Sequence, residues 1–415
     1  MYMSESNIVE KFEFNTSILT SYDGHEQRIK TRQYPRHYVS YKYDAMDASQ
    51  AQWMRAQIRI RQSDVMYIPM WQNCVMLTED HFGGYSLSID SEYLYAFYMC
   101  DAVEIFAHDD VMGFNKTNLQ KLIRQYTGDK IVLNTVLDKY LDKKITYLYP
   151  LVRCTTLPDH ELDYVFSNGA SSTLNFEQIT YKPTAQIPNS AMAGYNYDVP
   201  RFNIFHLPER YSERDVLLNT PTWVNDDANK ITVGKHTNLL DNTSGIFKYD
   251  LKNSKSYDMM SFDLLFRNKR MIFNFIKFFT NAGGRYKSFY VPTWANDFDV
   301  QYDIKASDNF FVTKLSGIYQ YYISNTRKRK IVIFTRDWKS YICDVATYTY
   351  ITIDGQRYGK VVLSKPIGTA LITKDILQVS FLSLVRFDDD TLTLNYETTE
   401  IATTTVVMRE VDDDE

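Results

Sequence analysis

The chain has 415 residues, of which 44% are hydrophobic and 23% are charged, the balance of an ordinary globular protein. Its 15 glycines and 11 prolines are too few for a fibrous or low-complexity class. The net charge of −5 speaks against a protein that coats nucleic acid, since such proteins depend on clustered Lys and Arg, and we expect no stable nucleic-acid binding. The 33 tyrosines and 24 phenylalanines favour β-strands and protein interfaces.

The first residues, MYMSESNIVEKFEF, have neither the basic nor the apolar region of a secretory signal peptide. No stretch approaches the roughly 18 apolar residues of a membrane span, so we expect no membrane insertion and a soluble product made in the cytoplasm. The four cysteines lack C-x-x-C spacing, which predicts free thiols rather than a zinc site or a disulfide framework. They are Cys74, Cys100, Cys154 and Cys343.

Two stretches far apart in the chain share a common opening. A turn at Gly24 precedes by 17 residues an aromatic strand position, Tyr41, and a turn at Gly245 precedes Phe262 by the same spacing. A helix is predicted directly afterwards in both places, over residues 48–61 and 267–282. This parallel is the first sign of an internal repeat.

The strongest recurrence is a Y-[IV]-P-x-W pentapeptide that follows each predicted helix. It contains Pro69 and Trp71 in the first copy and Pro292 and Trp294 in the second. Further along, YPLVR matches LSLVR, so that the arginines that end these stretches are paired. These recurrences predict a tandem duplication. The ten positions that mark it are Gly24, Tyr41, Pro69, Trp71 and Arg153, matched with Gly245, Phe262, Pro292, Trp294 and Arg386.

The repeats divide the chain into a first β-rich module (1–181), a proline-containing linker or insertion (182–229), a second β-rich module (230–411) and an acidic tail (412–415). Short strands separated by turn signals, such as Asp354-Gly355, are typical of sandwiches and barrels. The predicted fold class is mainly β, with two tandem, homologous β-sandwich or barrel-like modules that each pack one helix.

No catalytic, cofactor or metal site is predicted. The run 108–110 (HDD) could supply metal ligands, but the matching run 335–337 has no histidine, and 388–390 (DDD) is better explained as a turn between strands. His25-Glu26 belongs to no H-E-x-x-H motif, and nucleophile elbows and phosphate-binding loops are absent from the sequence.

Two further features allow alternative interpretations. Trp71 and Trp294 could form platforms for sugars, although we favour core anchors, with Pro69 and Pro292 where a strand bends or meets an edge. The basic run 327–330 is interpreted as a solvated hairpin tip, with contact to a polyanion as the alternative.

The run Gly24-His-Glu-Gln-Arg28, followed by aromatic alternation, a helix and the proline-tryptophan strand, resembles distal and minor tail proteins of tailed bacteriophages and gene transfer agents. In these proteins an S-G-x-E-x-R turn opens a β-domain. The second copy, Gly245-Ile-Phe-Lys-Tyr249, lacks the Glu and Arg of that turn. The resemblance implies a ring that joins the tail tube to the baseplate hub, with a galectin-like sandwich outside an inner β-layer.

The function expected from these observations is that of a non-enzymatic structural protein of a virion tail. It would form a homo-oligomeric ring, such as a trimer or hexamer, and bind tube, hub or fibre proteins without a cofactor. A carbohydrate-binding adhesin of the tail tip is the alternative, and a polysaccharide-degrading enzyme is a third, weaker hypothesis.

Overall fold

The structure is a computed structural model, and it describes residues 2–3, 8–21, 25–45, 47–90, 93, 96–97, 100–108, 116–127, 129–157, 160–166, 169–179, 210–222, 229–241, 245, 247–323 and 327–412. Gly24 and most of the predicted linker therefore lie outside the described residues. We call residues 2–179 the N-terminal half and residues 229–412 the C-terminal half.

The fully described elements of the N-terminal half are strands, one 3-10 turn and the helix α1. These elements are β1 (Tyr2–Met3), β2 (Ile8–Glu13), β3 (Thr16–Thr20), β4 (Glu26–Lys30), β5 (Arg36–Ala45), α1 (Ala48–Arg61), β6 (Val65–Pro69), the 3-10 turn η1 (Trp71–Asn73), β7 (Val75–Met76), β8 (Gly84–Ser88), β9 (Ala102–His108), β10 (Lys116–Thr127), β11 (Lys130–Leu137), β12 (Thr146–Thr156), β13 (Asp163–Phe166) and β14 (Gly169–Gln178).

The C-terminal half has the same character and is preceded by a short hairpin, β15 (Arg210–Tyr211) and β16 (Arg214–Asp215). Its elements are β17 (Asn229–Asp241), β18 (Phe247–Phe266), α4 (Lys269–Ala282), β19 (Phe289–Pro292), β20 (Phe310–Thr313), α5 (Ile318–Tyr322), β21 (Lys330–Thr335), β22 (Ser340–Ile353), β23 (Gln356–Leu363), η3 (Thr373–Asp375), β24 (Ile376–Phe387), β25 (Thr391–Tyr396) and β26 (Ala402–Glu410). The mainly-β fold class is confirmed.

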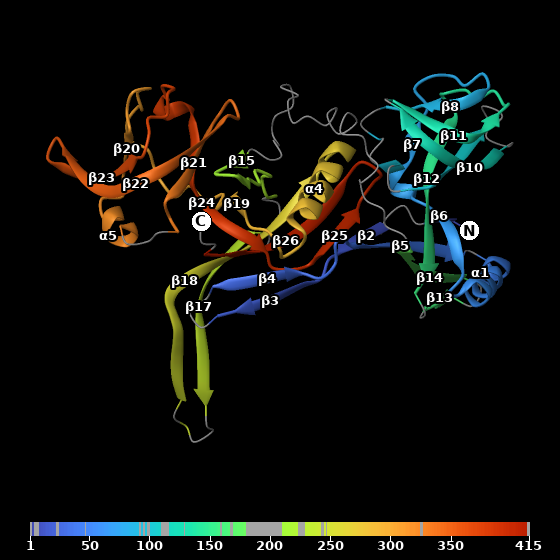
Figure 1. The fold of residues 1–415 in the computed structure, drawn as a ribbon, viewed down its shortest axis with the longest axis horizontal. Coiled ribbons are helices and arrows are strands. Elements are labelled where there is room, and N and C mark those ends of the chain that lie inside the picture. Colours follow the sequence, from blue (N-terminus) through green and yellow to red (C-terminus); the bar gives the residue numbers. More distant parts are fainter. Residues whose placement is uncertain are drawn as a thin grey trace.

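One antiparallel sheet runs through both halves. Its strands pair in the order β14-β5-β2-β25-β26-β18-β17, and β2 lies between β5 of its own half and β25 of the other. Figure 1 shows this sheet across the middle of an elongated molecule, with α4 on one face and a strand-rich lobe at each end. The long β17–β18 hairpin projects away from the rest of the molecule.

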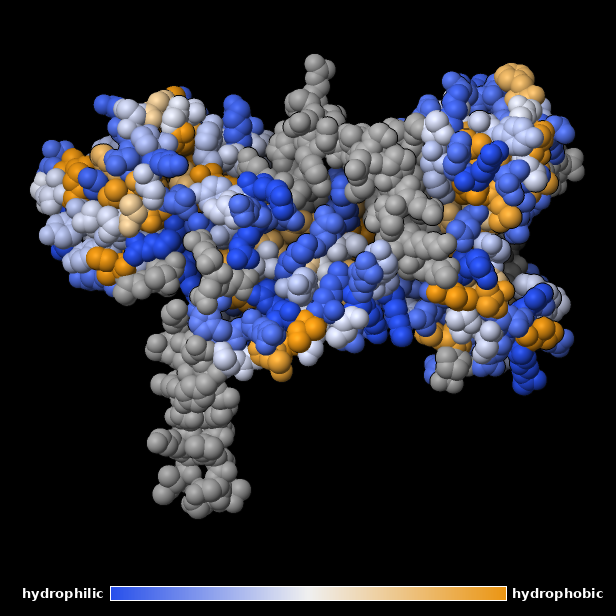
Figure 2. Space-filling model, in the orientation of Figure 1, coloured by the Kyte–Doolittle hydropathy of each residue, from blue (hydrophilic) through white to orange (hydrophobic). Residues whose placement is uncertain are grey.

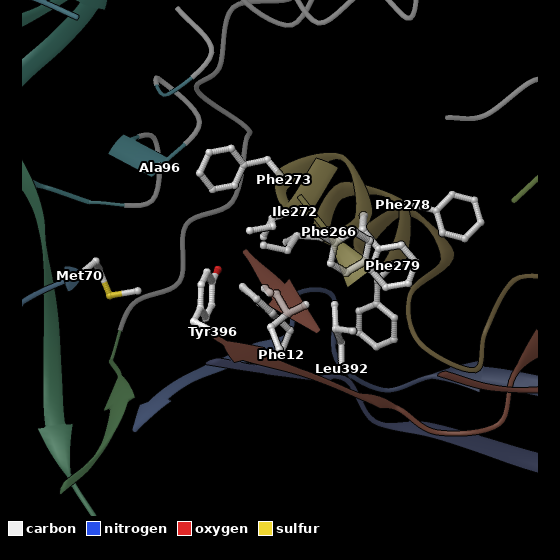
Figure 3. Close-up of a cluster of buried hydrophobic side chains, with 14 of the residues drawn as sticks. Phe12, Met70, Ala96, Phe266, Ile272, Phe273, Phe278, Phe279, Leu392 and Tyr396 are labelled. Atoms are coloured by element: carbon white, nitrogen blue, oxygen red, sulfur yellow. The ribbon is translucent and has the colours of Figure 1, made fainter. Parts of the chain in front are cut away.

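Helix α4 supplies the centre of the main core. It begins at Asn268, whose side chain accepts a hydrogen bond from the backbone of Met271, and ends at Gly283, which has a φ of 69°. Apolar residues at helical spacing bury its inner face, and Phe279 lies 5.1 Å from the ring of Phe387. Figure 3 shows Ile272 and Phe279 of this helix facing strands that carry Phe12 of the N-terminal half and Leu392 of the C-terminal half.

Helix α1 is much less buried. It spans the predicted residues, and Asp47 caps it by accepting a hydrogen bond from the backbone of Gln50 at 2.8 Å. Only Ala51 and Met54 are buried, whereas eight residues of α4 are. The difference arises because α4 lies between the two halves and α1 lies at the end of the molecule.

One prediction about a charged segment is wrong. The basic run 327–330 is not a solvated hairpin tip, because it lies between α5 and β21 and its side chains form ion pairs. Lys328 reaches Asp258 at 2.6 Å, and Arg327 pairs with Asp412 of the predicted acidic tail. Oppositely charged partners lower the free-energy cost of burying these side chains. The basic side chains therefore link neighbouring segments of the fold instead of facing water.

The β22–β23 hairpin confirms the predicted Asp354-Gly355 turn. Both residues have positive φ, 51° and 80°, as a two-residue hairpin turn requires. A helix long and apolar enough to cross a membrane is not found in the described part of the chain.

Gly359 of β23 is expected not to tolerate a side chain. A Cβ atom there would lie 1.9 Å from the backbone oxygen of Leu315. Gly359→Ala should therefore lower the free energy of unfolding by about 2 kcal/mol, since packed strands must shift. Urea unfolding checks this, and Gly317→Ala is the control, because its Cβ would meet its nearest neighbour at 3.4 Å. Equal effects of the two substitutions would contradict the prediction.

Candidate functional site

The strongest concentration of buried polar groups lies at the joint, which we define as the contact between β2, β5 and η1 of the N-terminal half and β25 and α4 of the C-terminal half. Glu10 of β2 is its centre, with only 2% of the residue exposed. Its carboxylate accepts a hydrogen bond from Tyr396 of β25 at 2.6 Å and contacts Nε2 of His37 on β5 at 2.7 Å. A carboxylate thus ties three strands from both halves.

His37 extends this network away from Glu10. Its Nδ1 lies 2.7 Å from Oε1 of Gln178, at the end of β14, and its ring stacks on Phe12 with centroids 4.7 Å apart. Both ring nitrogens therefore lie within hydrogen-bond distance of a side-chain oxygen on a neighbouring strand. Burial alone would raise the pKa of Glu10, but the hydrogen bonds and charge of His37 outweigh it and lower the pKa.

Lys269, the first residue of α4, enters the joint from the C-terminal half. Its ammonium group donates to the backbone oxygen of Gln72 and to Oδ1 of Asn73 in η1, the latter at 3.2 Å. It also lies 5.0 Å from the ring centroid of Tyr396. Burial lowers the pKa of Lys269 to about 8, and the nearby Glu10 carboxylate limits the decrease.

Tyr41 joins the predicted signature positions to this network. Its hydroxyl donates to Oε1 of Gln72 at 2.8 Å and accepts from the backbone N–H of Trp71 at 3.3 Å. The side chain of Tyr41 is fully buried. Its predicted counterpart, Phe262, has no hydroxyl and is buried in the same core.

The β3–β4 hairpin forms a second set of contacts between the halves. Arg386 of β24 donates to both carboxylate oxygens of Glu26 in β4, at 2.7 and 2.9 Å, and also to Asp388 at 2.8 Å. Burial would lower the pKa of Arg386, but the bonds and charges of Glu26 and Asp388 raise it. A bidentate pair of this kind fixes both position and orientation.

Asp390 holds the base of the same hairpin. It accepts from the backbone N–H and the hydroxyl of Thr16, at 2.7 and 2.8 Å, and from the backbone N–H of Arg285 at 2.9 Å. The predicted Asp388–Asp390 turn is therefore a turn between β24 and β25 whose carboxylates organise the contact. Arg28 adds a bond to the backbone oxygen of Tyr286 at 3.0 Å.

A cavity of about 1120 Å³ opens beside this hairpin. It is bounded by β4, the β15–β16 segment and the end of α4, and its lining contains both signs of charge. Basic Arg28, Arg214 and Lys287 alternate with acidic Glu213 and Asp215, so no single-sign field attracts an ionic ligand.

The signature prolines and tryptophans hold matching places. Pro69 ends β6 and Pro292 ends β19. Trp294 is 7% exposed and stacks on Phe334 at 4.9 Å, while Trp71 is partly buried and packs edge-on against Tyr149. These surroundings fit the core-anchor interpretation better than that of a sugar platform.

One predicted equivalence needs correction. Leu151 lies opposite Pro69 and Leu382 lies opposite Pro292, so counting along β12 and β24 matches Arg153 with Leu384. Arg386 lies two residues further on. Arg153 is exposed, whereas Arg386 is buried in its ion pair, so the two arginines have different roles.

Sequence reasoning missed Glu10, His37 and Lys269. A signal was present, because Ile8, Glu10 and Phe12 occupy alternate positions and so share the inward face of β2. A charged residue such as Glu10 on the inward face of a strand indicates that an oppositely charged or hydrogen-bonding group is buried beside it. The partners themselves are not adjacent in the chain, since His37 and Tyr396 are 27 and 386 residues away from Glu10.

The run 108–110, considered above as a source of metal ligands, is not tested. His108 ends β9, and Asp109 and Asp110 lie outside the described residues. Among the residues that the structure does describe, no cluster of three His, Cys, Asp or Glu side chains could hold a metal. The four cysteines are free, as predicted.

The polar side chains of the joint are arranged to bind one another across the two halves. Comparison with known proteins adds no name to this arrangement: no family model matches the chain, and no curated protein is a significant match.

Proposed function

We propose that the chain is an internally duplicated, non-enzymatic structural protein of a virion tail, which forms a ring that connects the tail tube to the baseplate hub or fibres. The supporting observation is that both halves use one strand-pairing scheme. Nine strand pairings of the N-terminal half have a counterpart in the C-terminal half. Four lie in the central sheet: β2–β5 matches β17–β18, β5–β14 matches β18–β26, β12–β14 matches β24–β26, and β13–β14 matches β25–β26. The other five continue from there: β6–β12 matches β19–β24, β9–β12 matches β21–β24, β9–β10 matches β21–β22, β10–β11 matches β22–β23, and β8–β11 matches β20–β23.

The irregularities of the ladders support the same proposal. The β10–β11 pairing shifts register between Ile123 and Gln125, and the β22–β23 pairing shifts between Val345 and Thr347. Bulges are retained within families because they bend strands in a specific way. A matching bulge at the matching place is therefore stronger support than shared strand order alone.

The surroundings of the signature tryptophans also match. The residue before Trp71 donates its backbone N–H to Pro150, and the residue before Trp294 donates to Phe381, both at 2.9 Å. Phe381 occupies the position in β24 that Pro150 occupies in β12.

The duplication would serve a ring in the following way. Two similar units in one chain can occupy two quasi-equivalent positions, so that a trimer presents six similar units to its neighbours. Exposed aromatic residues, including Tyr321 at 74% exposure, supply the contact area that protein interfaces favour. The sequence resemblance to distal tail proteins supports the tail as the location.

Two measurements test the proposal. Light scattering after size-exclusion chromatography should give a closed oligomer of the purified chain, and antibody labelling of tailed particles should place the chain at the tail tip. A protein that remains monomeric at all concentrations and is missing from purified particles would overturn the proposal.

A further inference from the structure

We infer that the distal part of the β17–β18 hairpin docks on the N-terminal half of a second copy of this chain. The inference rests on the proposed duplication, and it specifies the contact by which neighbouring copies of the chain would join in the proposed ring. The docking face is the outer surface of β6, β12 and β14, defined by Val65, Tyr67, Arg153 and Ile179. The template is the contact that the β3–β4 hairpin makes inside the chain.

The two hairpins correspond residue by residue. In the N-terminal half, Thr16 pairs with Lys30 and the ladder ends at Thr20 and Glu26. In the C-terminal half, the β17–β18 register shifts after Lys235, and a distal ladder then runs from Thr237 paired with Leu251 to Asp241 paired with Phe247. Both distal ladders have five pairs, and in both hairpins five residues of sequence separate the two strands. The β3–β4 hairpin extends the β2–β5 pair, and the distal ladder extends the base of the β17–β18 pair, which corresponds to β2–β5.

The two hairpins differ in what they touch. The β3–β4 hairpin lies across the C-terminal half, where Arg386 binds Glu26 and Asp390 binds Thr16. The distal β17–β18 ladder extends away from the molecule (Figure 1). If the same relation holds between copies, this ladder meets the surface of an N-terminal half that corresponds to the surface around Arg386.

By the register established above, Arg386 corresponds to Thr155, which pairs with Val65 of the docking face. Among the residues that the structure describes, this face is exposed. Tyr67 pairs with Arg153, and Ile179 donates its backbone N–H to Arg153 at 3.0 Å, so the residues are neighbours on adjacent strands. Tyr67 is 38% exposed and Ile179 is 43% exposed. Their counterparts in the C-terminal half, Tyr290 and Val411, are 3% and 6% exposed.

Part of that difference has a clear cause. In the C-terminal half, the segment before β17 lies along β19, where Leu217 donates its backbone N–H to Tyr290 at 2.8 Å. Hydrophobic patches are visible in Figure 2 on the lobe that holds β6, β14 and α1. Exposed apolar groups of this kind mark contacts with other chains.

The chemistry of each hairpin suits its partner surface. The β3–β4 sequences, TSILT and EQRIK, are polar and meet the charged Arg386 and Asp390. The distal β17–β18 sequences, TNLLD and FKYDL, are richer in apolar residues. The docking face has changed in the same direction, since it exposes Val65, Tyr67 and Ile179. A second copy of the chain is therefore the occupant that fits both surfaces.

A complementation experiment tests the contact. One variant replaces residues 236–255 with Asn-Gly, which joins the paired Lys235 and Ser256 by a two-residue turn and leaves the base of the hairpin intact. A second variant carries Val65→Asp and Tyr67→Asp on the docking face. Phe82→Asp is the matched control, because Phe82 is 83% exposed in the same half but outside the docking face.

Sedimentation velocity should show an oligomer for the wild type and for Phe82→Asp, and monomers for each of the other two variants. An equimolar mixture of those two should form dimers and nothing larger, because one supplies the docking face and the other supplies the hairpin. Circular dichroism should confirm that every variant is folded.

The negative outcomes separate the two proposals. If the wild type forms an oligomer that both variants retain, the docking inference is overturned and the ring stands. If both variants are monomeric but their mixture does not dimerise, the head-to-tail contact is overturned. A wild type that stays monomeric at every concentration contradicts the ring and the contact together.

Discussion

Replacing Glu10 with leucine is expected to lower the free energy of unfolding by about 3–5 kcal/mol, the cost of removing one partner from a buried ion pair. The substitution leaves His37 without its carboxylate partner and the hydroxyl of Tyr396 without an acceptor. Because β2 is the strand that joins β5 to β25, the loss should weaken the contact between the halves. Urea unfolding followed by circular dichroism measures this loss in the free energy of unfolding.

Glu13→Leu is the matched control. Glu13 lies on the same strand and also forms an ion pair, with Arg32 at 2.8 Å, but its side chain is 37% exposed. Exposed pairs contribute about 0–1 kcal/mol, so this substitution should have a small effect. Similar losses for Glu10 and Glu13 would show that the joint does not depend on its buried carboxylate.

The same carboxylate predicts a pH dependence. The folded-state pKa of Glu10 is lowered from its usual 4.5, so its contribution to stability is fully present above about pH 4.5 and is lost as the pH falls through the folded value. The difference in stability between wild type and Glu10→Leu should therefore shrink in acid.

Lys269→Met is expected to remove a rise in stability between pH 8 and pH 10.5. Burial holds the pKa of Lys269 at about 8 in the folded protein, against 10.5 for an exposed lysine. Between these values the unfolded chain binds more protons, so wild-type stability increases with pH, by about 3 kcal/mol over the range. Methionine does not titrate. The measurement is urea unfolding of both proteins from pH 7 to pH 10.5.

Lys328→Met is the control for this comparison. Lys328 is also buried, and burial alone would lower its pKa, but Glu410 and Asp258 outweigh burial and raise it above 10.5. Its contribution is fully present below pH 10.5 and is lost only at higher pH, so the difference from wild type should stay flat between pH 8 and pH 10.5. Parallel pH profiles for wild type and Lys269→Met would contradict the burial of a charged amine at the joint.

The sequence by itself predicted the local structure well. The helix over Ala48–Arg61 has the predicted bounds, and the second helix starts at Lys269, two residues later than predicted, because Asn268 caps it. The end of that helix at Gly283 and the turn at Asp354-Gly355 both require positive φ values, which glycine and aspartate adopt at low cost. Such features depend on neighbours in the chain, and a sequence displays those neighbours directly.

The proposed repeat was predicted for the same reason, since its signature positions keep fixed spacings. The match of Arg153 with Arg386 failed because identical residues can arise by chance two positions apart on one strand face. Strand register corrects it, and register depends on pairing with β6 and β19.

Only the tertiary structure decided where buried charges meet. Glu10 and Tyr396 are 386 residues apart. The basic run around Lys328 was predicted to face water, but the fold places Asp258 and Glu410 beside it. Composition and periodicity determine which face of a strand is buried, because that information is local. Which strands lie side by side depends on the summed free energy of the whole core, so partners at long range, and the joint they form, appear only in three dimensions.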